Sequence, residues 1–389
     1  MAATSHYRLQ LIVFALVSAS YTNIYITQPV LPILQAEFEA DMVLVSLSVS
    51  AVILGIALFN VPFGYLADRV PIQPIILTGG IAVAAGGLVC ALTSNLWILI
   101  AGRFLQGVFI PALTTCLAAY LAKSLPAARL NVVMGSYVAA TVLGGLGGRL
   151  LGGWIHPPLH WRFAFISAAA LILIATIVAV RGLPRTASST GQQRDSISIA
   201  TLLTRREILQ IYFCGAGSFA IFSSVFNYLP FRLAAPPFNF STELTTLLYL
   251  TYTVGIFMGP VAGKISDRMG SGNTLIAGSL VLGAGLILLW LPSILAVILG
   301  LMGICASFFS IHAAAVGALN RMLSGSQGRA NALYVLFYYI GGWLGITVFG
   351  MVYQRRGWRA VVFLGLFLLI IPVSAGIRQR KISKDRTQG

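Results

Sequence analysis

Two arginines and one histidine stand within long apolar segments of this sequence, where ionisable side chains are rare. Arg103 lies in the run 96–121, Arg149 in the run 131–155 and His312 in the run 293–319. A charge placed among apolar residues is costly and usually serves a function. These three residues are therefore candidates for binding a substrate or carrying a proton.

The two arginines allow two interpretations. If neighbouring runs are antiparallel helices, a rise of about 1.5 Å per residue puts Arg103 about 10 Å from the start of its run and Arg149 about 27 Å from the start of the next, so both lie toward the same end. Such a pair attracts an anionic or acid-bearing substrate. Alternatively, both arginines are structural and pair with helix carbonyls, or with Glu37 or Asp41 at that end.

His312 is the only histidine inside such a run, and an imidazole titrates near neutral pH. It can carry a coupling proton, or it can simply pack between helices. The nine acids lie in loops, at run ends or in the C-terminal tail: Glu37, Glu39, Asp41, Asp68, Asp195, Glu207, Glu243, Asp267 and Asp385. No carboxylate that alternates between a proton and a cation is therefore expected in the middle of a run.

The elements that position these residues are predicted to be membrane-spanning helices. Only 9% of the 389 residues are charged, whereas a soluble domain carries about 25%. Apolar runs near the ~20 residues that a bilayer core requires recur over 9–34, 43–66, 74–94, 96–121, 131–155, 162–181, 208–231, 244–266, 274–291, 293–319, 329–353 and 359–377. Backbone groups in lipid must bond internally, so these twelve runs are predicted to be helices.

The basic residues indicate topology. A net charge of +16 would suggest nucleic acid as the partner of a soluble protein, but here the cations occupy short loops between apolar runs. With the N-terminus inside, 18 Lys and Arg residues fall on the cytoplasmic side and five outside. This bias predicts that both termini are cytoplasmic. The four cysteines lie far apart in apolar runs, so neither a disulfide framework nor a metal site is expected.

The chain is predicted to divide into two six-helix halves, 1–182 and 208–389, joined by a flexible cytoplasmic linker at 183–207. Three motifs recur at nearly one offset. The segment 64–69 returns at 263–268, 129–131 returns at 329–331, and 161–162 returns at 358–359. Each recurrence falls in the same loop of its half, which indicates duplication. Parallel six-helix repeats related by an axis along the membrane normal occur in one known transporter fold.

The motifs resemble those of the major facilitator superfamily over essentially the whole chain. The segment 64–69 matches the start of the family's Gly-x-Leu-Ala-Asp-Arg-x-Gly-Arg-Lys loop, but Pro71, Ile72 and Gln73 replace its glycine and two cations. The segment 99–107 resembles the family's Leu-x-x-x-Arg-x-x-Gln-Gly motif. Segments 28–32, 226–233, 236–238 and 333–339 resemble the YnfM-type branch of drug:proton antiporter relatives.

A glycine pattern in the run 131–155 resembles the family's antiporter motif, Gly-x8-Gly-x3-Gly-Pro-x2-Gly-Gly. Its glycine positions are Gly135, Gly144, Gly148, Gly152 and Gly153, and Arg149 replaces the proline. Glycines at this spacing let helix backbones approach closely. The family resemblance links such packing to antiport and efflux.

The resemblance also implies a gate and a cavity. In the family, Asp68 would face the start of the run 329–353 and stabilise a helix N-terminus. The expected gating residues are Gly64, Asp68, Arg69, Gly263, Asp267, Arg268 and Asn331. The expected substrate and coupling residues, on helices that line the family's cavity, are Asn23, Tyr25, Gln28, Arg103, Gln106, Arg149, Asn227, Tyr228, His312 and Tyr338.

We therefore expect an all-α membrane protein with twelve transmembrane helices in two pseudo-symmetric bundles. The expected function is export of a small organic molecule or drug from a bacterium across its inner membrane, by alternating access and coupled to the proton gradient. The transporter would be a monomer in lipid, without cofactor, metal, catalytic residue or nucleic acid. Two alternatives are a facilitator or importer of a small organic anion or sugar-like solute, and a transporter-derived receptor without turnover.

Overall fold

The computed structural model describes residues 2–184, 198–323 and 327–388, and the described residues are almost entirely helical. The first half contains α1 (Ala2–Tyr25), η1 (Gln28–Val30), α2 (Leu31–Glu37), α3 (Met42–Leu66), α4 (Ile72–Leu92), α5 (Leu96–Leu113), α6 (Thr115–Ser124), α7 (Ala127–Ile155) and α8 (Arg162–Gly182). The remainder contains α9 (Ile199–Thr204), α10 (Arg206–Ala234), α11 (Thr242–Leu248), η2 (Tyr249–Thr253), α12 (Val254–Met269), α13 (Ser271–Leu288), α14 (Ile294–Arg321), α15 (Gln327–Leu368) and α16 (Ile370–Gln388).

The structure confirms the prediction of long apolar helices that can span a membrane. Ten helical stretches of the described chain are long and apolar enough to cross a membrane, and the bent pair 242–258 and 261–269 adds an eleventh. One of the ten, Gly328–Ile382, has 55 residues, which is about 80 Å of helix and more than twice a ~30 Å bilayer core. Gly357 breaks this stretch with φ 74°. Its two parts correspond to the runs predicted at 329–353 and 359–377.

Several predicted runs contain breaks that the apolar pattern did not indicate. The first run ends its helix at Tyr25 and continues through η1 into α2, where Pro29 and Pro32 remove backbone donors. The fourth run divides at Thr114, three residues after Pro111. The run 244–266 passes through the 3₁₀ segment η2. These breaks leave backbone carbonyls within the bundle that require partners from other side chains.

The predicted linker 183–207 is helical in part. α9 occupies Ile199–Thr204, and the Ser198 side chain accepts a hydrogen bond from the Thr201 amide at its start. This N-cap explains why a helix forms in a segment whose polar composition predicted a flexible chain. Residues 185–197 of the linker, including Asp195, lie outside the described residues.

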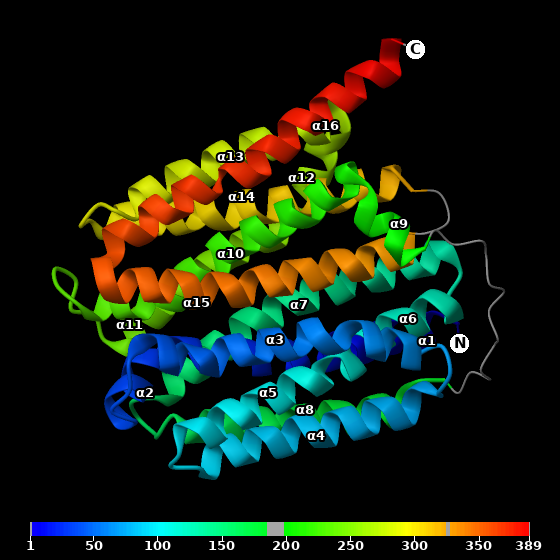
Figure 1. Ribbon diagram of the computed structural model, residues 1–389. Coiled ribbons are helices and arrows are strands. Elements are labelled where there is room, and N and C mark those ends of the chain that lie inside the picture. Colours follow the sequence, from blue (N-terminus) through cyan, green and yellow to red (C-terminus); the bar gives the residue numbers. More distant parts are fainter. Residues whose placement is uncertain (1, 185–197, 324–326, 389) are drawn as a thin grey trace. The chain divides into compact units, whose positions relative to one another are not determined.

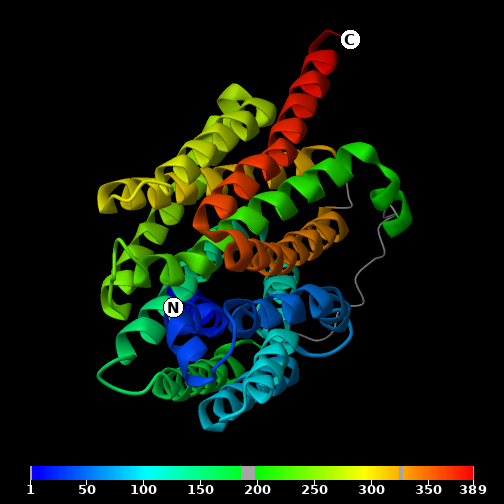
Figure 2. The ribbon, with the colours of Figure 1, turned by 60° about the vertical axis from the view of Figure 1, so that its left-hand side comes forward.

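Contacts divide the chain into two units. Unit 1 contains residues 1–192 and 240–249, and unit 2 contains residues 193–239 and 250–389. In unit 1, α1 packs on α7, α4 on α8, and both α3 and α4 on α5; α4, α5 and α8 lie side by side in both ribbon views (Figures 1 and 2). In unit 2, α10 packs on α15, α13 on α16, and both α12 and α13 on α14. The same helix pairings therefore occur in both units, in agreement with the sequence repeats.

The segment 240–249 is grouped with unit 1 although it follows the linker. Its helix α11 packs on α7 and on η1. Unit 1 is thus built from the first half of the sequence together with a short piece of the second.

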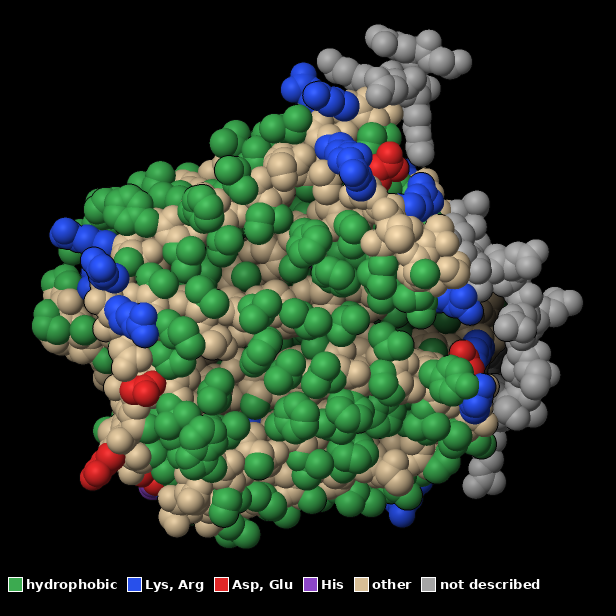
Figure 3. Space-filling model, viewed as in Figure 1, with side chains coloured by type: hydrophobic (Ala, Val, Ile, Leu, Met, Phe, Trp, Pro, Cys, Tyr) green, Lys and Arg blue, Asp and Glu red, His purple; other side chains and the backbone are tan. Residues whose placement is uncertain are grey.

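The surfaces of the helices are apolar between their ends. On the face in Figure 3, hydrophobic side chains cover the middle of the helices, and Lys, Arg, Asp and Glu side chains gather toward the edges. Exposed apolar residues include Leu92, Phe257 and Leu280. Lipid tails solvate such a surface, whereas water does not.

Candidate functional site

Three glycines of α7 form a close seam with α1. A Cβ on Gly144, Gly148 or Gly152 would collide with the carbonyl oxygens of Ser18, Thr22 and Ile26, respectively. The hydroxyl groups of Ser18 and Thr22 donate across the seam to carbonyls of α7, each at 3.3 Å. Both helices advance by four residues between contacts, so the backbones remain close over two turns. The close packing predicted from the glycine spacing is present at these positions.

The remaining two glycines of the motif differ from each other. Gly153 faces α11, where a Cβ would collide with the Thr246 side chain. Gly135 is exposed, and a Cβ there would meet no described atom within 4 Å. The packing explanation offered for the whole motif therefore fails for Gly135, which lies toward the start of α7, before the seam begins.

Unit 2 contains a matching seam between α10 and α15. A Cβ on Gly341 or Gly345 would collide with the backbone of Ala216 or Ala220, respectively. These four residues follow Gly144, Gly148, Ser18 and Thr22 at nearly the offset of the sequence motifs. The duplication thus extends from the loops to the packing of the helices.

Arg103 is fully buried and donates four hydrogen bonds to described residues. Its guanidinium donates to the carbonyls of Asn23 at 2.6 Å, Ile24 at 2.5 Å and Ser48 at 2.7 Å. It also donates to Gln106 Oε1 at 2.5 Å. The carbonyls of Asn23 and Ile24 belong to the last turn of α1, where intrahelical partners are missing. Arg103 therefore caps the broken end of α1, as the structural interpretation of this residue predicted.

Gln106 extends the network around Arg103. Its Nε2 donates to Asn23 Oδ1 at 3.1 Å and to the Val83 carbonyl at 3.0 Å. Asn23 in turn donates to the Ala19 carbonyl at 2.9 Å. The predicted residues Asn23, Arg103 and Gln106 are thus brought together, and they join α1, α4 and α5 to one another.

Arg149 lies next to the following turn of the same broken helix. Its Nε donates to Gln28 Oε1 and its Nη1 to the Gly145 carbonyl, each at 2.8 Å. Its guanidinium carbon lies 4.0 Å from the ring centre of Tyr25 and 5.5 Å from that of Tyr249. Arg149 is 1% exposed and Gln28 is fully buried. Aromatic rings attract a guanidinium by cation–π interaction, and the same guanidinium can donate hydrogen bonds in its plane.

Two polar side-chain atoms of the neighbouring residues 27 and 28 have no partner in the part of the chain that the structure describes. They are Gln28 Nε2, on the amide that accepts from Arg149, and the Thr27 hydroxyl. Both residues are 0% exposed. An amide nitrogen carries two donors, and a buried donor without an acceptor is costly.

His312 belongs to an aromatic cluster in unit 2. Its Nδ1 lies 3.0 Å from the Tyr334 hydroxyl, and its ring centre lies 5.3 Å from that of Tyr338. Tyr338 stacks on Phe219 with ring centres 3.8 Å apart. Tyr228 donates to the Ile346 carbonyl at 2.7 Å, and Asn227 is buried beside it on α10. The predicted residues of unit 2 thus come from α10, α14 and α15.

The gating acids have partners that the sequence motifs did not indicate. Asp68 pairs with Lys123 at 2.5 Å, and Asp267 pairs with Arg321 at 3.8 Å. Lys123 lies in the last turn of α6 and Arg321 in the last turn of α14, so the two ion pairs occupy equivalent places in the two units. The signal for them was a basic residue at the end of the fourth run of each half.

The other gating residues have separate contacts. Arg69 lies 3.8 Å from the ring centre of Tyr65, and Asn331 donates to Asn320 Oδ1 at 2.9 Å. Gly64 and Gly263 are not in close packing, and Arg268 is exposed. Asp68 belongs to unit 1 and Asn331 to unit 2. The proximity expected between these two residues stays a prediction.

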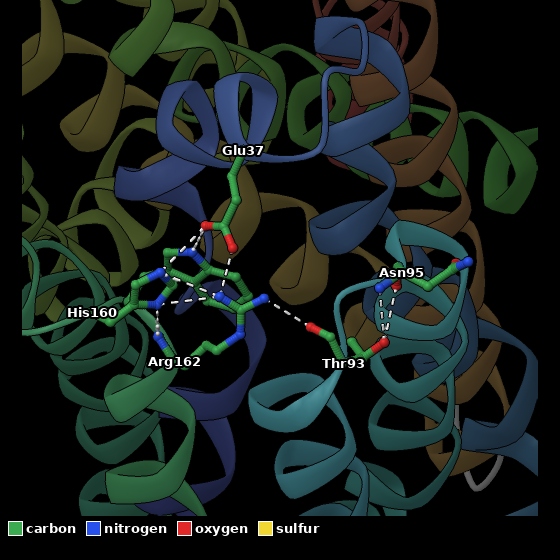
Figure 4. A network of polar contacts seen from close by, with 6 residues as sticks. Glu37, Thr93, Asn95, His160 and Arg162 are labelled. Atoms are coloured by element: carbon green, nitrogen blue, oxygen red, sulfur yellow. Dashed lines mark hydrogen bonds and ion pairs between the residues drawn. The ribbon is translucent and has the colours of Figure 1, made fainter.

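A second polar network joins the end of α2, the start of α8 and the residue that follows α4 (Figure 4). The Glu37 carboxylate accepts from Arg162 at 2.5 Å and from Trp161 Nε1, and His160 lies 3.6 Å from it. Arg162 also donates to the Thr93 carbonyl at 2.9 Å. Asp41 accepts from the Val43 and Leu44 amides at the start of α3. The rim acids considered as partners of the buried arginines are therefore engaged by other groups.

The cysteines and acids offer no metal site in the described chain. No group of three His, Cys, Asp or Glu residues is arranged to hold an ion there. The four cysteines are buried.

The fold defines a multi-pass membrane protein with buried polar groups inside repeated helical units. The chain belongs to the Major Facilitator Superfamily, whose family model matches residues 13–311 and 238–384. Related proteins of this family are transporters, and the chain is accordingly a membrane transporter of the same superfamily.

Three curated relatives illustrate the similarity. The MFS-type transporter YybF of Bacillus subtilis is 26% identical over 92% of this chain and 91% of its own length. The inner membrane transport protein YnfM of Escherichia coli is 26% identical over 95% of this chain and 90% of its own. The transporter YgaY of Escherichia coli O157:H7 is 29% identical over 89% of each. The resemblance to YnfM seen in the sequence is thus confirmed.

Solved structures show the same fold. A bacterial homologue of the human lysosomal transporter Spinster, in an inward-facing and unoccupied conformation, superposes with a TM-score of 0.77 over 98% of both chains at 13% identity. The nucleoside transporter NupG gives a TM-score of 0.78 over 96% of this chain and 99% of its own, at 12% identity. At these identities the likeness concerns the fold alone.

Proposed function

We propose that this transporter exports a small organic molecule from a bacterium in exchange for protons, by alternating access across the inner membrane. Both termini lie in the cytoplasm in this proposal, because 18 of the basic residues then fall on that side. The name of YnfM, an inner membrane transport protein, supports the same compartment. The chain acts as a monomer in lipid and carries out no chemical step on its substrate.

The observation that carries the proposal is the seam between α1 and α7. The glycines at Gly144, Gly148 and Gly152 match the family's antiporter motif and bring the two backbones into contact. A helix pair without intervening side chains leaves no path for protons or solutes along its interface. Such a seal suits an exchanger, in which leakage of protons would uncouple the gradient from transport.

His312 is assigned the coupling proton in this proposal. It lies within a helix of the membrane region, it titrates near neutral pH in its ordinary form, and the Tyr334 hydroxyl lies 3.0 Å from its Nδ1. The acids with described side chains lie near helix ends, so none of them competes for this role from the middle of a span. The predicted gate residues, among them Asp68 and Asp267, open and close access from the cytoplasm.

Proteoliposomes test the proposal. The full-length protein is reconstituted with a pH-sensitive dye inside, and organic compounds are added under an imposed pH gradient. Exchange predicts substrate-dependent proton movement against the direction of substrate flux, abolished when the gradient is collapsed. A substrate flux that does not depend on the proton gradient would contradict proton coupling. Substrate binding without any flux would indicate a receptor.

A second candidate function is facilitated uptake of a small organic anion. Arg149 favours it, because the guanidinium is buried among a glutamine, a carbonyl and two tyrosine rings. A positive charge in a medium of low dielectric constant attracts an anion strongly. In the same proteoliposomes, uptake down a concentration gradient at equal pH on both sides would support this function over exchange.

A further inference from the structure

The hydrogen bond between Tyr334 and His312 has a direction that the burial of the tyrosine determines. The Tyr334 hydroxyl lies 3.0 Å from His312 Nδ1, and Tyr334 is 1% exposed. Among the residues that the structure describes, this hydroxyl has no other partner. If Nδ1 were the donor, the hydroxyl hydrogen would be buried without an acceptor, which is costly. Tyr334 therefore donates, and neutral His312 carries its proton on Nε2.

Unit 1 contains the same tyrosine contact with a different partner. Tyr137 precedes the first glycine of the seam in unit 1 by seven residues, and Tyr334 precedes that of unit 2 by seven residues. Tyr137 bonds to Thr114, whose hydroxyl donates its own hydrogen to the Ile110 carbonyl at 3.1 Å. Tyr137 is thus the donor to Thr114, as Tyr334 is to His312. The two contacts differ in that only an imidazole can take up a proton near neutral pH.

The Tyr334 hydroxyl also lies in the contact between α15 and α10. A Cβ on Gly215 of α10 would come within 2.7 Å of the ring carbon Cζ and 2.8 Å of the hydroxyl oxygen of Tyr334. The next residue, Ala216, is the one that Gly341 of α15 touches. One side chain therefore connects His312 on α14 with the seam between α10 and α15.

The surroundings of His312 provide no charged group to accommodate a proton. Its ring lies 5.3 Å from that of Tyr338 and 6.2 Å from that of Phe308, measured between centres. Of the described elements packed against α14, α13 has no ionisable residue, and the charged residues of α10, α12 and α15 lie toward helix ends or at the break of α15. Between these ends lie tyrosines and Cys214, and phenols and thiols are uncharged near neutral pH. The response to a proton therefore falls to Tyr334.

Protonation of His312 reverses its hydrogen bond with Tyr334. The lone pair of the neutral ring is on Nδ1, so an added proton binds there, and Nδ1–H then donates to the Tyr334 oxygen. The tyrosine keeps its own hydrogen, which must turn away from His312, and the described residues offer it no other acceptor. A buried donor in that state is unfavourable, so protonation disfavours the present packing of α15 on α10.

We propose that Tyr334 is a positioning residue for His312 and that it converts protonation of His312 into a loosened contact between α15 and α10. The inference rests on the proposed function, in which His312 carries the coupling proton. The equivalent contact in unit 1 does not respond, because Thr114 does not titrate.

NMR of the purified full-length protein, isotope-labelled in its histidine rings, reports which ring nitrogen carries the proton. The chain has four histidines, and His312→Thr identifies the signals of His312 by their loss. Neutral His312 should be the Nε2–H tautomer in the wild type. Tyr334→Phe removes only the hydroxyl and should raise the ratio of Nδ1–H to Nε2–H about fivefold, the factor that corresponds to one hydrogen bond of ordinary strength.

Matched variants separate this role from a general effect on folding. Tyr137→Phe removes the equivalent donor of unit 1 and should leave the tautomer ratio unchanged. Gly215→Ala displaces the Tyr334 ring and should change the ratio as Tyr334→Phe does, which keeps the test decisive if Tyr334→Phe does not fold. Gly217→Ala is its control, because a Cβ there would meet only the Ile371 side chain, at 3.2 Å or more.

Spin labels test the link to the helix contact. Cysteines introduced at the exposed positions Phe213 on α10 and Leu344 on α15 carry the labels. The label-to-label distance should lengthen or broaden between about pH 8 and about pH 5, the range in which an imidazole titrates. The change should be absent in Tyr334→Phe and in His312→Thr. A distance that does not depend on pH in the wild type, or the same change in Tyr334→Phe, would overturn the proposal.

Flux in proteoliposomes distinguishes the failure of this inference from the failure of the proposed function. The compound used is one whose flux moves protons in the wild type. If His312→Thr abolishes the response to the pH gradient while Tyr334→Phe leaves the tautomer ratio as in the wild type, the role of Tyr334 is refuted and proton coupling stands. If Tyr334→Phe changes the tautomer ratio and the label distance but His312→Thr keeps the wild-type response, the role of Tyr334 stands and His312 is not the coupling group.

Discussion

Replacing Arg103 by methionine should destabilise the protein more than the same replacement at Arg149. Both side chains are buried cations of equal size, but they bond different kinds of carbonyl. Arg103 serves Asn23 and Ile24 in the last turn of α1, where helix partners are missing. Arg149 serves the Gly145 carbonyl in the interior of α7, which lies within a continuous helix. The same substitution at Arg149 is therefore a control for the substitution at Arg103.

The magnitude follows from the groups that are left unsatisfied. A buried polar group without a partner costs about 1–3 kcal/mol. Arg103→Met leaves the Asn23 and Ile24 carbonyls in that state, so the free energy of unfolding should fall by about 2–6 kcal/mol. Arg149→Met mainly frees the Gln28 side chain, and about 1–3 kcal/mol is expected. Arg103→Lys retains the charge with fewer donors and should lie between Arg103→Met and the wild type.

Reversible unfolding in mixed micelles, followed by helix content, gives the free energy of unfolding for each variant. The purified variants should be compared without added ligand, so that binding at Arg149 does not enter. A loss of less than about 1 kcal/mol in Arg103→Met would refute the capping argument. A larger loss of unfolding free energy in Arg149→Met than in Arg103→Met would show that unpaired carbonyls at a helix end do not determine the destabilisation.

Three further predictions concern the seam, the gate and the coupling proton. Gly148→Ala should lower the free energy of unfolding by about 1–3 kcal/mol and abolish transport. Gly135→Ala, at an open position, should leave stability and transport near wild type. Equal losses in the two variants would contradict the close packing of α1 on α7. Asp68→Asn should change the free energy of unfolding by less than about 1 kcal/mol, because the ion pair of Asp68 with Lys123 is exposed. The substitution should nevertheless slow transport. Exchanging the charges of Asp68 and Lys123 should restore part of the transport rate. His312→Ala should abolish the response of flux to a pH gradient while substrate exchange continues, and an unaltered pH dependence would exclude His312 as the coupling group.

The helices and their duplication could be predicted because their signals are local. Apolar runs of nearly bilayer length fix the spans, and loop motifs that recur in both halves identify the repeat. The glycine spacing in α7 also predicted a close approach at Gly144, Gly148 and Gly152, since only small residues permit such contact. The partner helix could not be predicted, because the spacing shows which face is small but not what covers it.

The roles of the two arginines could not be separated from the sequence. Each looked like a charge in an apolar run, and depth estimates placed them together. The difference arises where α1 ends at Tyr25. The last turn of α1 presents carbonyls to Arg103, and the following η1 presents the amide side chain of Gln28 to Arg149. The three-residue spacing of Arg103 and Gln106 was the available hint of a shared network. The contacts to Asn23 and Ser48 come from distant parts of the chain.

The placement of α11 has a consequence for biogenesis. Unit 1 includes residues 240–249, so α7 receives Thr246 against Gly153, and Tyr249 beside Arg149, from beyond the linker. A nascent chain emerges from its N-terminus, and α7 is synthesised before α11. The packing of α7 is therefore complete only after the segment 240–249 has been synthesised. The ribosome must pass Tyr249 before the guanidinium of Arg149 is enclosed on that side.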